Sequence, residues 1–264
     1  MKISAVIITK NEEKMITGCL RTLSWADEIV IVDTGSTDKT NAIAKKYKAR
    51  IVNYDGPASY AQWRNKGLKE AKGEWILYVD ADERVTPSLR QEIINLVSQQ
   101  HSVYVASAIP RRNFIFGKEF KHGGQWPDYQ KRFFKKSNLM KWIGKVHEEP
   151  DFKGKLGYIK NPMLHIKHET LTEMVEKTND WSEVEGKLMF EAHHPPMTIV
   201  RFGSVALREF WLRMIKQMAF LDGGEGIIYA MYQVFSRFIS YAKLWELQIK
   251  SEARNTKIET NTNV

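Results

Sequence analysis

The chain has 264 residues, of which 43% are hydrophobic, and a formal net charge of +9 at pH 7. This length can bury one large domain with an addition, and the composition excludes collagen-like, repetitive and low-complexity chains. The single cysteine, Cys19, excludes an intramolecular disulfide and a thiolate metal cluster, which suits a reducing cytosol.

The first hundred residues alternate between strand-like and helix-like patterns. Short β-branched or aromatic runs predict strands at residues 3–9, 28–33, 50–54 and 75–79. Amphipathic stretches predict helices at residues 12–23, 38–47 and 60–71. Such alternation implies right-handed crossovers, an α/β class and a mostly parallel central sheet flanked by helices. Cys19 falls on the first helix, where we expect a small core residue.

The remaining chain changes character twice. Thr86 and Pro87 supply an N-cap and a first-turn proline for a helix to about residue 99, before a strand at 102–109. The pattern is irregular from 111 to about 160, except for a strand at 130–134. Beyond Leu171 we expect helices to residue 250, with a break at His193-His-Pro-Pro196, and a polar, disordered tail over 251–264. The expected domains are therefore 1–170, in halves 1–100 and 101–170, and a helical extension over 171–250.

The N-terminus reads as a first strand and not as a signal peptide, because its apolar run is short and no small-residue cleavage site follows. No stretch reaches the roughly 18 apolar residues of a membrane-spanning helix. We therefore expect a cytoplasmic protein, soluble or peripheral to a membrane.

Two aspartates follow the fourth strand, one residue apart. Asp80 and Asp82 stand at its carboxyl end, the edge of an open α/β sheet where ligands bind. Their oxygens could hold Mn²⁺ or Mg²⁺, which in turn neutralises a diphosphate. Polar residues also follow the first two strands, namely Thr9, Asn11, Glu12 and Asp33. Asp33 could accept a hydrogen bond from a pyrimidine N–H, whereas the alternative is that these loops only cap helices.

Several motifs together resemble a known family. They are Val6-Ile-Ile-Thr-Lys-Asn-Glu-Glu13, Ile29-Val-Ile-Val-Asp-Thr-Gly-Ser-Thr-Asp38, Arg64-Asn-Lys-Gly67 and Tyr78-Val-Asp-Ala-Asp82. The set, over about residues 3–100, is similar to the family 2 glycosyltransferases of GT-A fold. Sparser pieces at 130–134, 144–148, 163–165 and 220–226 resemble a bacterial subgroup that includes lipopolysaccharide inner-core β-1,4-glucosyltransferases.

The resemblance implies inverting transfer of a hexose, glucose above all, from a UDP-sugar, with 1–100 as the nucleotide-sugar half and 101–170 as the acceptor half. It places Asp33 on the uracil, Arg64 on the nucleotide side, Asp80 near the ribose and metal, and Asp82 on the Mn²⁺ or Mg²⁺. Thr9, Asn11 and Glu12 complete the implied donor site.

The resemblance also implies a catalytic carboxylate. An inverting displacement needs a base for the acceptor hydroxyl, and Glu148 occupies the subgroup's His-Glu position. The adjacent Glu149 stays open as an alternative, and His147 either orients the base or only packs. His165 also matches the subgroup and either binds the metal or diphosphate or is structural.

Residues 101–170 carry 14 basic and 6 acidic side chains, so most of the net charge lies there. Interleaved aromatic residues favour an anionic glycan or glycolipid acceptor, and we assign Lys135 and Lys136 to it. Peripheral contact with an anionic inner membrane is a further expectation, for which the aromatic C-terminal helices are either a contact or core. No nucleic-acid module is recognisable, so no nucleic acid is expected.

Two alternatives compete with this interpretation. A nucleotidyltransferase would carry a glycine-rich loop after the first strand, but residues 10–14 contain no glycine. A non-catalytic docking module for anionic lipid or nucleic acid would not need the aspartates and Glu148. No HExxH or CxxC pattern supports a zinc hydrolase.

Overall fold

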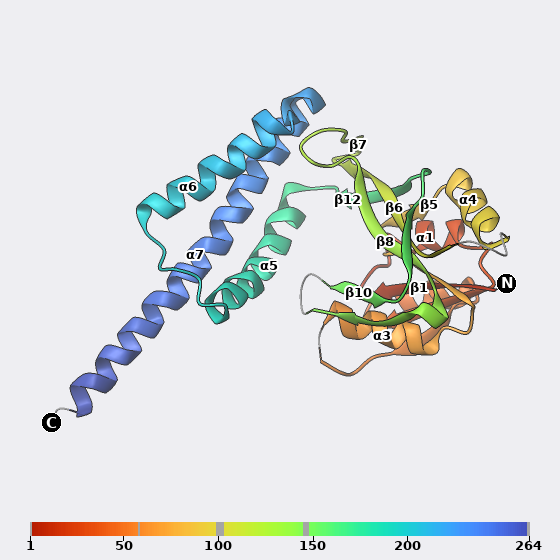
Figure 1. Cartoon of the computed structure of the whole chain (residues 1–264), viewed down its shortest axis with the longest axis horizontal. Helices are drawn as coiled ribbons and strands as arrows, with labels where there is room; N and C mark the ends of the chain where they lie inside the picture. Colours follow the sequence, from red (N-terminus) through yellow and green to blue (C-terminus); the bar gives the residue numbers. More distant parts are fainter. Residues whose placement is uncertain (1, 58, 99–102, 145–147, 263–264) are drawn as a thin grey trace. The chain divides into compact units, whose positions relative to one another are not determined.

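The computed structural model describes residues 2–57, 59–98, 103–144 and 148–262, and it divides into two compact units (Figure 1). The first unit comprises Met1–Phe114 and Trp126–Lys167, and the second comprises Ile115–Gln125 and His168–Val264. The segment Ile115–Gln125 therefore belongs with the C-terminal helices, although the sequence placed it in the acceptor half.

The first unit is built on a mixed sheet. Its main strands run in the order β3-β2-β1-β4-β8-β6-β12-β5. Their bounds are β1 Ile3–Thr9, β2 Glu28–Asp33, β3 Arg50–Asn53, β4 Trp75–Tyr78, β5 Glu83–Val85, β6 Tyr104–Ile115, β8 Asp128–Lys135 and β12 Met163–His168. The first four pair in parallel, as the sequence predicts. Beyond β4 the expected parallel order ends, since β8 pairs antiparallel with both β4 and β6.

Helices cover both faces of the parallel half. The helices are α1 Ile16–Thr22, α2 Thr40–Lys46, α3 Tyr60–Glu70 and α4 Pro87–Ser98. Apolar residues of α1, α2 and α4 pack on one face with Ile7 and Leu77, and α3 covers the other face with Val6. Gly67 lets α3 approach closely, because a Cβ there would lie 2.3 Å from Val6 Cγ1. Cys19 is buried in the core as expected, and this burial raises the pKa of its thiol.

A separate hairpin lies on α3. It consists of β9 Leu139–Ile143 and β10 Glu149–Phe152, preceded by a 3-10 turn at Lys136–Asn138. The Asn65 side chain holds β9, since its Nδ2 donates to the Trp142 carbonyl at 2.9 Å and its Oδ1 accepts from Trp142 N at 2.7 Å. The hairpin places Glu148, which precedes β10, beside α3. The short strands β7 Lys118–Glu119 and β11 Lys155–Tyr158 complete the strand set of the described residues.

The second unit is helical. Its elements are α5 Leu171–Glu191, α6 Ile199–Phe210, a π-helical turn Trp211–Lys216, a 3-10 turn Ala219–Asp222 and α7 Gly223–Thr262. The helix break at the two prolines is confirmed, and Thr198 caps α6 by accepting from Arg201 N. The backbone stays helical to Thr262, through the predicted disordered tail, because residues 251–262 contain no proline or glycine to end the helix. None of the helices over the described residues has the length and hydropathy to cross a membrane.

Candidate active site

The loops after β1 and β2 interlock at the carboxyl edge of the parallel strands. Asn11 adopts a left-handed conformation, with φ of 56°, and its Oδ1 accepts a hydrogen bond from Thr37 N at 2.8 Å. Its own N–H donates to Ser36 Oγ at 3.0 Å, and Glu12 N donates to Thr40 Oγ1 at 2.7 Å. Asn11 and Glu12 therefore fix the shape of this edge.

Asp33 and Thr9 lie buried directly beneath these loops. The Asp33 carboxylate accepts from Ser36 N at 3.1 Å and from Thr9 Oγ1 at 3.3 Å. Burial favours the protonated form of Asp33, but the hydrogen bonds from Ser36, Asn41 and Gly35 outweigh it and lower its pKa. Asp33 is thus a charged carboxylate that holds the turn after β2, whereas α2 begins at Thr40 without a side-chain cap at its N-cap residue, Lys39.

Asp80 lies between two buried arginines. Arg64 Nη2, from α3, lies 3.3 Å from Asp80 Oδ1, and Arg132 of β8 forms an ion pair with Asp80 Oδ2. Arg132 also contacts the fully buried carboxylate of Glu83 at 3.0 Å. Desolvation would raise the pKa of Asp80, but the charges of Arg132 and Arg64 dominate and hold it well below its usual range. The network keeps Asp80 ionised.

Arg64 also joins Asp80 to the expected base. Its Nε donates to Glu148 Oε1 at 2.9 Å, while its guanidinium lies over the Trp142 ring at 4.9 Å from the centroid. The Glu148 side chain is 17% exposed, whereas that of Glu149 is 63% exposed and pairs with Lys131. Glu148 therefore faces the aspartates and Glu149 faces solvent. His147, named as an orienting group, lies outside the described residues.

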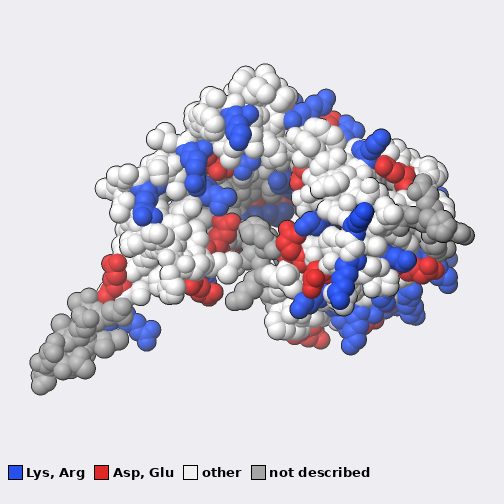
Figure 2. All heavy atoms as spheres, in the orientation of Figure 1, with Lys and Arg blue, Asp and Glu red and all other residues white. Residues whose placement is uncertain are grey.

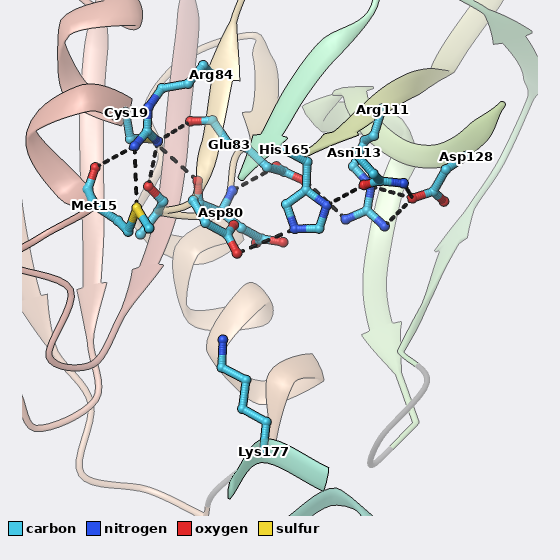
Figure 3. A network of polar contacts seen from close by, with 12 residues as sticks. Met15, Cys19, Asp80, Glu83, Arg84, Arg111, Asn113, Asp128, His165 and Lys177 are labelled. Carbon is cyan, nitrogen blue, oxygen red and sulfur yellow. Dashed lines mark hydrogen bonds and ion pairs between the residues drawn. The ribbon is translucent and has the colours of Figure 1, made fainter. Parts of the chain in front are cut away.

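Figure 3 shows His165 between Asp80 on one side and Asn113 and Asp128 on the other. Asp82 contacts the same imidazole. His165 Nε2 lies 3.4 Å from Asp82 Oδ2, and its Nδ1 lies 2.7 Å from Asn113 Oδ1. Asn113 Nδ2 donates to Asp128, which fixes the amide with its oxygen toward the imidazole. His165 Nδ1 must then carry the hydrogen, so Nε2 is directed at Asp82.

The residues at this edge fit a divalent ion that is shared with a diphosphate. Asp82 Oδ1 is buried and has no hydrogen-bond partner among the residues that the structure describes, so one hard oxygen is available to a cation. No group of three His, Cys, Asp or Glu side chains among the described residues could hold an ion alone. Mg²⁺ in phosphate sites needs only one or two carboxylates besides substrate oxygens and water. Asp82, assisted by His165 or Asp80, meets that requirement.

Three groups of this network were not identified as site residues from the sequence. Glu83, Arg132 and Asn113 lie on strands β5, β8 and β6 and support Asp80 and His165. Arg132 belongs to the 130–134 motif, but it was included among the 14 basic residues of 101–170 that were expected to face an anionic acceptor. A useful signal was its place in a strand of buried phenylalanines, where a charged side chain needs a buried partner.

The assignment of Lys135 and Lys136 to the acceptor does not fit the register. Lys135 pairs with Trp75 at the start of β4, and Lys136 N donates to the Glu74 carbonyl at 2.8 Å. Trp75 precedes Asp80 by five positions, which is about 17 Å along an extended chain. Because β8 runs antiparallel to β4, these lysines lie at the opposite edge of the sheet.

Comparison with known proteins identifies the family. The sequence model of glycosyl transferase family 2 matches residues 4–154, more than half of the chain. The chain is a family 2 glycosyltransferase. This glycosyltransferase is 29% identical over 265 residues to an uncharacterized glycosyltransferase of Rickettsia bellii, covering 94% of this chain and 88% of that protein. It is 26% identical over 256 residues to the lipopolysaccharide core biosynthesis glycosyltransferase LpsC of Rhizobium meliloti, covering 93% of each.

The fold of the glycosyltransferase also matches a solved structure. Residues 1–349 of Staphylococcus aureus TarS, crystallised in complex with UDP-GlcNAc, align with a TM-score of 0.50 and 16% identity. The alignment covers 95% of this chain and 92% of that one. The GT-A fold with a helical C-terminal part is therefore confirmed, as is the expected family.

Proposed function

We propose that this glycosyltransferase moves a hexose, with glucose as the first candidate, from a UDP-sugar to a phosphorylated glycan or glycolipid, with inversion. The observation that carries the proposal is the position of Arg64. Its guanidinium contacts Asp80, on the expected donor side, and Glu148, the expected base. One buried cation thus fixes the two carboxylates between which donor and acceptor would meet.

The donor would lie along the carboxyl ends of β1, β2 and β4. Asp33 would accept from the uracil N–H, and the loop of Thr9, Asn11 and Glu12 would border the nucleotide. Asp82, with His165 and Asp80, would hold Mn²⁺ or Mg²⁺. When bound, that ion neutralises the charge that develops on the departing UDP. With its Nδ1 held by Asn113 Oδ1, His165 would offer Nε2 as a ligand.

Glu148 would take the proton from the acceptor hydroxyl while the hydroxyl oxygen attacks the anomeric carbon of the donor sugar and the bond from that carbon to UDP breaks. Its contact with Arg64 would hold the carboxylate in place. Two exposed tyrosines accompany Lys131, the ion-pair partner of Glu149. Tyr129 lies two residues before Lys131 on β8 and therefore on the same face of the strand. The Tyr129 and Tyr158 rings meet edge to face, with 5.2 Å between their centroids. We assign these rings to an acceptor sugar and Lys131 to an acceptor phosphate.

The name of one relative supports a role in cell-envelope synthesis as part of this proposal. LpsC, which aligns along nearly its whole length, is named for lipopolysaccharide core biosynthesis. We therefore propose a growing lipopolysaccharide core, or a similar envelope glycan, as the acceptor. The enzyme would act in the cytoplasm, at the inner face of a bacterial inner membrane.

A donor screen tests this proposal. UDP-glucose, UDP-galactose, UDP-GlcNAc and GDP-mannose are each incubated with the enzyme and Mn²⁺, and thermal stabilisation and nucleotide release are measured with and without EDTA. One UDP-sugar at 100 times its Kd should stabilise the fold by about 2.7 kcal/mol, and EDTA should abolish the effect. Stabilisation by nucleoside triphosphates with pyrophosphate release would instead support a nucleotidyltransferase. No response to any nucleotide, with salt-sensitive binding of anionic lipid or DNA, would support the docking module.

A further inference from the structure

Helix α6 presents its apolar side to solvent. Ile199, Val200 and Leu207 are 91%, 80% and 71% exposed. The opposite side packs, since Val205 is buried and the Phe202 ring lies 5.3 Å from that of Phe238 on α7. A helix on a protein core normally shows the reverse arrangement, with its apolar stripe inward. Several neighbouring apolar side chains exposed in this way indicate a contact with another protein or a membrane.

The apolar stripe continues past the end of α6. Leu207 follows Val200 by seven positions and Trp211 follows Leu207 by four, which keeps them on one side of a helix. In the π-helical turn, Trp211 and Ile215 are 54% and 56% exposed. We call Ile199, Val200, Leu207, Trp211 and Ile215 the α6 face.

Basic side chains accompany the α6 face. Residues 199–216 contain Arg201, Arg208, Arg213 and Lys216, and their single acidic residue is Glu209. Glu209 is buried and accepts from Arg213 Nε at 2.7 Å, so it does not offset the exposed cations. Figure 2 shows basic side chains among largely uncharged atoms over α6. Residues 171–264 together have 11 basic and 12 acidic side chains, so the excess of basic residues over 199–216 does not show in the net charge of the segment.

We propose that the α6 face docks on an anionic lipid bilayer. An amphipathic helix with a tryptophan on its apolar face and arginines beside it lies in the plane of such a surface, with the apolar side chains below the headgroups. Charge argues against a second copy of the chain as the occupant. In a two-fold contact between antiparallel α6 helices, each arginine border would meet the same border of its partner, and the segment 199–216 offers only the buried Glu209 to balance it. The inference deepens the proposed function, on which it rests for the membrane-bound acceptor.

Vesicle binding tests the docking surface. The full chain is sedimented with vesicles of phosphatidylcholine alone and of phosphatidylcholine with roughly 30% phosphatidylglycerol, an anionic lipid that attracts basic segments. The wild type should bind the anionic vesicles, and Leu207→Glu/Trp211→Glu should lose at least tenfold in partitioning with an unchanged circular dichroism spectrum. Arg201→Glu/Arg208→Glu should lose binding by about 25-fold or more, from about fivefold per cation, and Arg201→Lys/Arg208→Lys should retain it. Val103→Glu, which alters an exposed apolar residue of the first unit, is the matched control and should bind as the wild type.

The same variants separate this proposal from the enzymatic one. UDP release from a water-soluble donor should be equal in the wild type and in Leu207→Glu/Trp211→Glu. Unchanged vesicle binding in this variant, or equal loss in Val103→Glu, would overturn the docking proposal. The docking proposal would also be overturned if the wild type is a dimer in gel filtration, Leu207→Glu/Trp211→Glu is a monomer, and neither binds vesicles. The α6 face would then be assigned to contact with a second copy of the chain. If the wild type binds anionic vesicles, Leu207→Glu/Trp211→Glu does not, and neither protein turns over a UDP-sugar, the docking proposal stands and only the proposed function is refuted.

Discussion

Replacement of Glu148 by glutamine should remove the proton acceptor and keep the architecture around it. In the wild type, Arg64 Nε donates to Glu148 Oε1 at 2.9 Å. Glutamine can offer its amide oxygen to the same donor. The weaker, uncharged bond should lower the free energy of unfolding by about 1 kcal/mol. Arg64 keeps its contact with Asp80 at 3.3 Å and its place over Trp142. Because a positioned base typically contributes 10²–10⁴-fold, kcat should fall by about that factor, or about 3–5 kcal/mol in activation free energy.

The assay is kcat at saturating donor and acceptor, with the KM of the UDP-sugar measured beside it. The KM should stay within a few-fold, since the base acts in the transition state. Glu149→Gln is the matched control: its exposed ion pair with Lys131 is worth about 0–1 kcal/mol, and the variant should turn over normally. A crippled Glu149→Gln beside an active Glu148→Gln would exchange the two roles. Normal turnover by both would refute the assignment of the base.

Three further predictions follow from individual contacts. Gly67→Ala places a Cβ 2.3 Å from Val6 Cγ1 and should lower the free energy of unfolding by about 1–3 kcal/mol in urea titration; an unchanged midpoint would contradict this close approach. Asn113→Ala removes the partner of His165 Nδ1 and should weaken Mn²⁺ binding in the presence of UDP by about 10–100-fold, whereas equal affinity would exclude His165 as an oriented ligand. The pKa of Asp80 is lowered from its ordinary value of 3.8, so the charged carboxylate stabilises the fold at a pH above 3.8. This stabilisation is lost progressively as the pH falls below 3.8 toward the lowered pKa. Acid unfolding curves of Asp80→Asn should therefore be flatter than those of the wild type below about pH 4, and identical slopes would contradict the ion-pair network.

The parallel half of the sheet was predictable because its signals are local. The bounds of β1 and β2 agree with the sequence prediction, since each is a continuous apolar run that ends at a polar loop. The position of Asp80 and Asp82 beyond β4 follows from the same pattern. Helices α1 and α2 begin later than expected, because Asn11 and Glu13 of the first loop donate hydrogen bonds to Ser36 and Asp38 of the second before either helix starts.

The antiparallel half was not predictable in the same way. Arg132 reaches Asp80 from 52 positions away, and His165 reaches Asp82 across 83 positions, so no local period records either pairing. Glu148 and Glu149 have the same side-chain chemistry, and only the β9–β10 hairpin directs one to Arg64 and the other to Lys131. The outward apolar stripe of α6 has the period of an ordinary core helix, so sequence could not show which side was exposed.

The central claim is that the carboxyl edge of the sheet binds UDP through a divalent ion on Asp82. Calorimetric titration of UDP, with and without Mn²⁺, into the wild type and Asp82→Ala tests it most directly. The Asp82 side chain is 29% exposed and its one ion pair among the described residues is with His165, at 3.4 Å, so the variant should keep the wild-type circular dichroism spectrum. We predict that Mn²⁺ tightens UDP binding in the wild type and has no such effect in Asp82→Ala. UDP binding with the same Mn²⁺ dependence in both proteins would contradict the account.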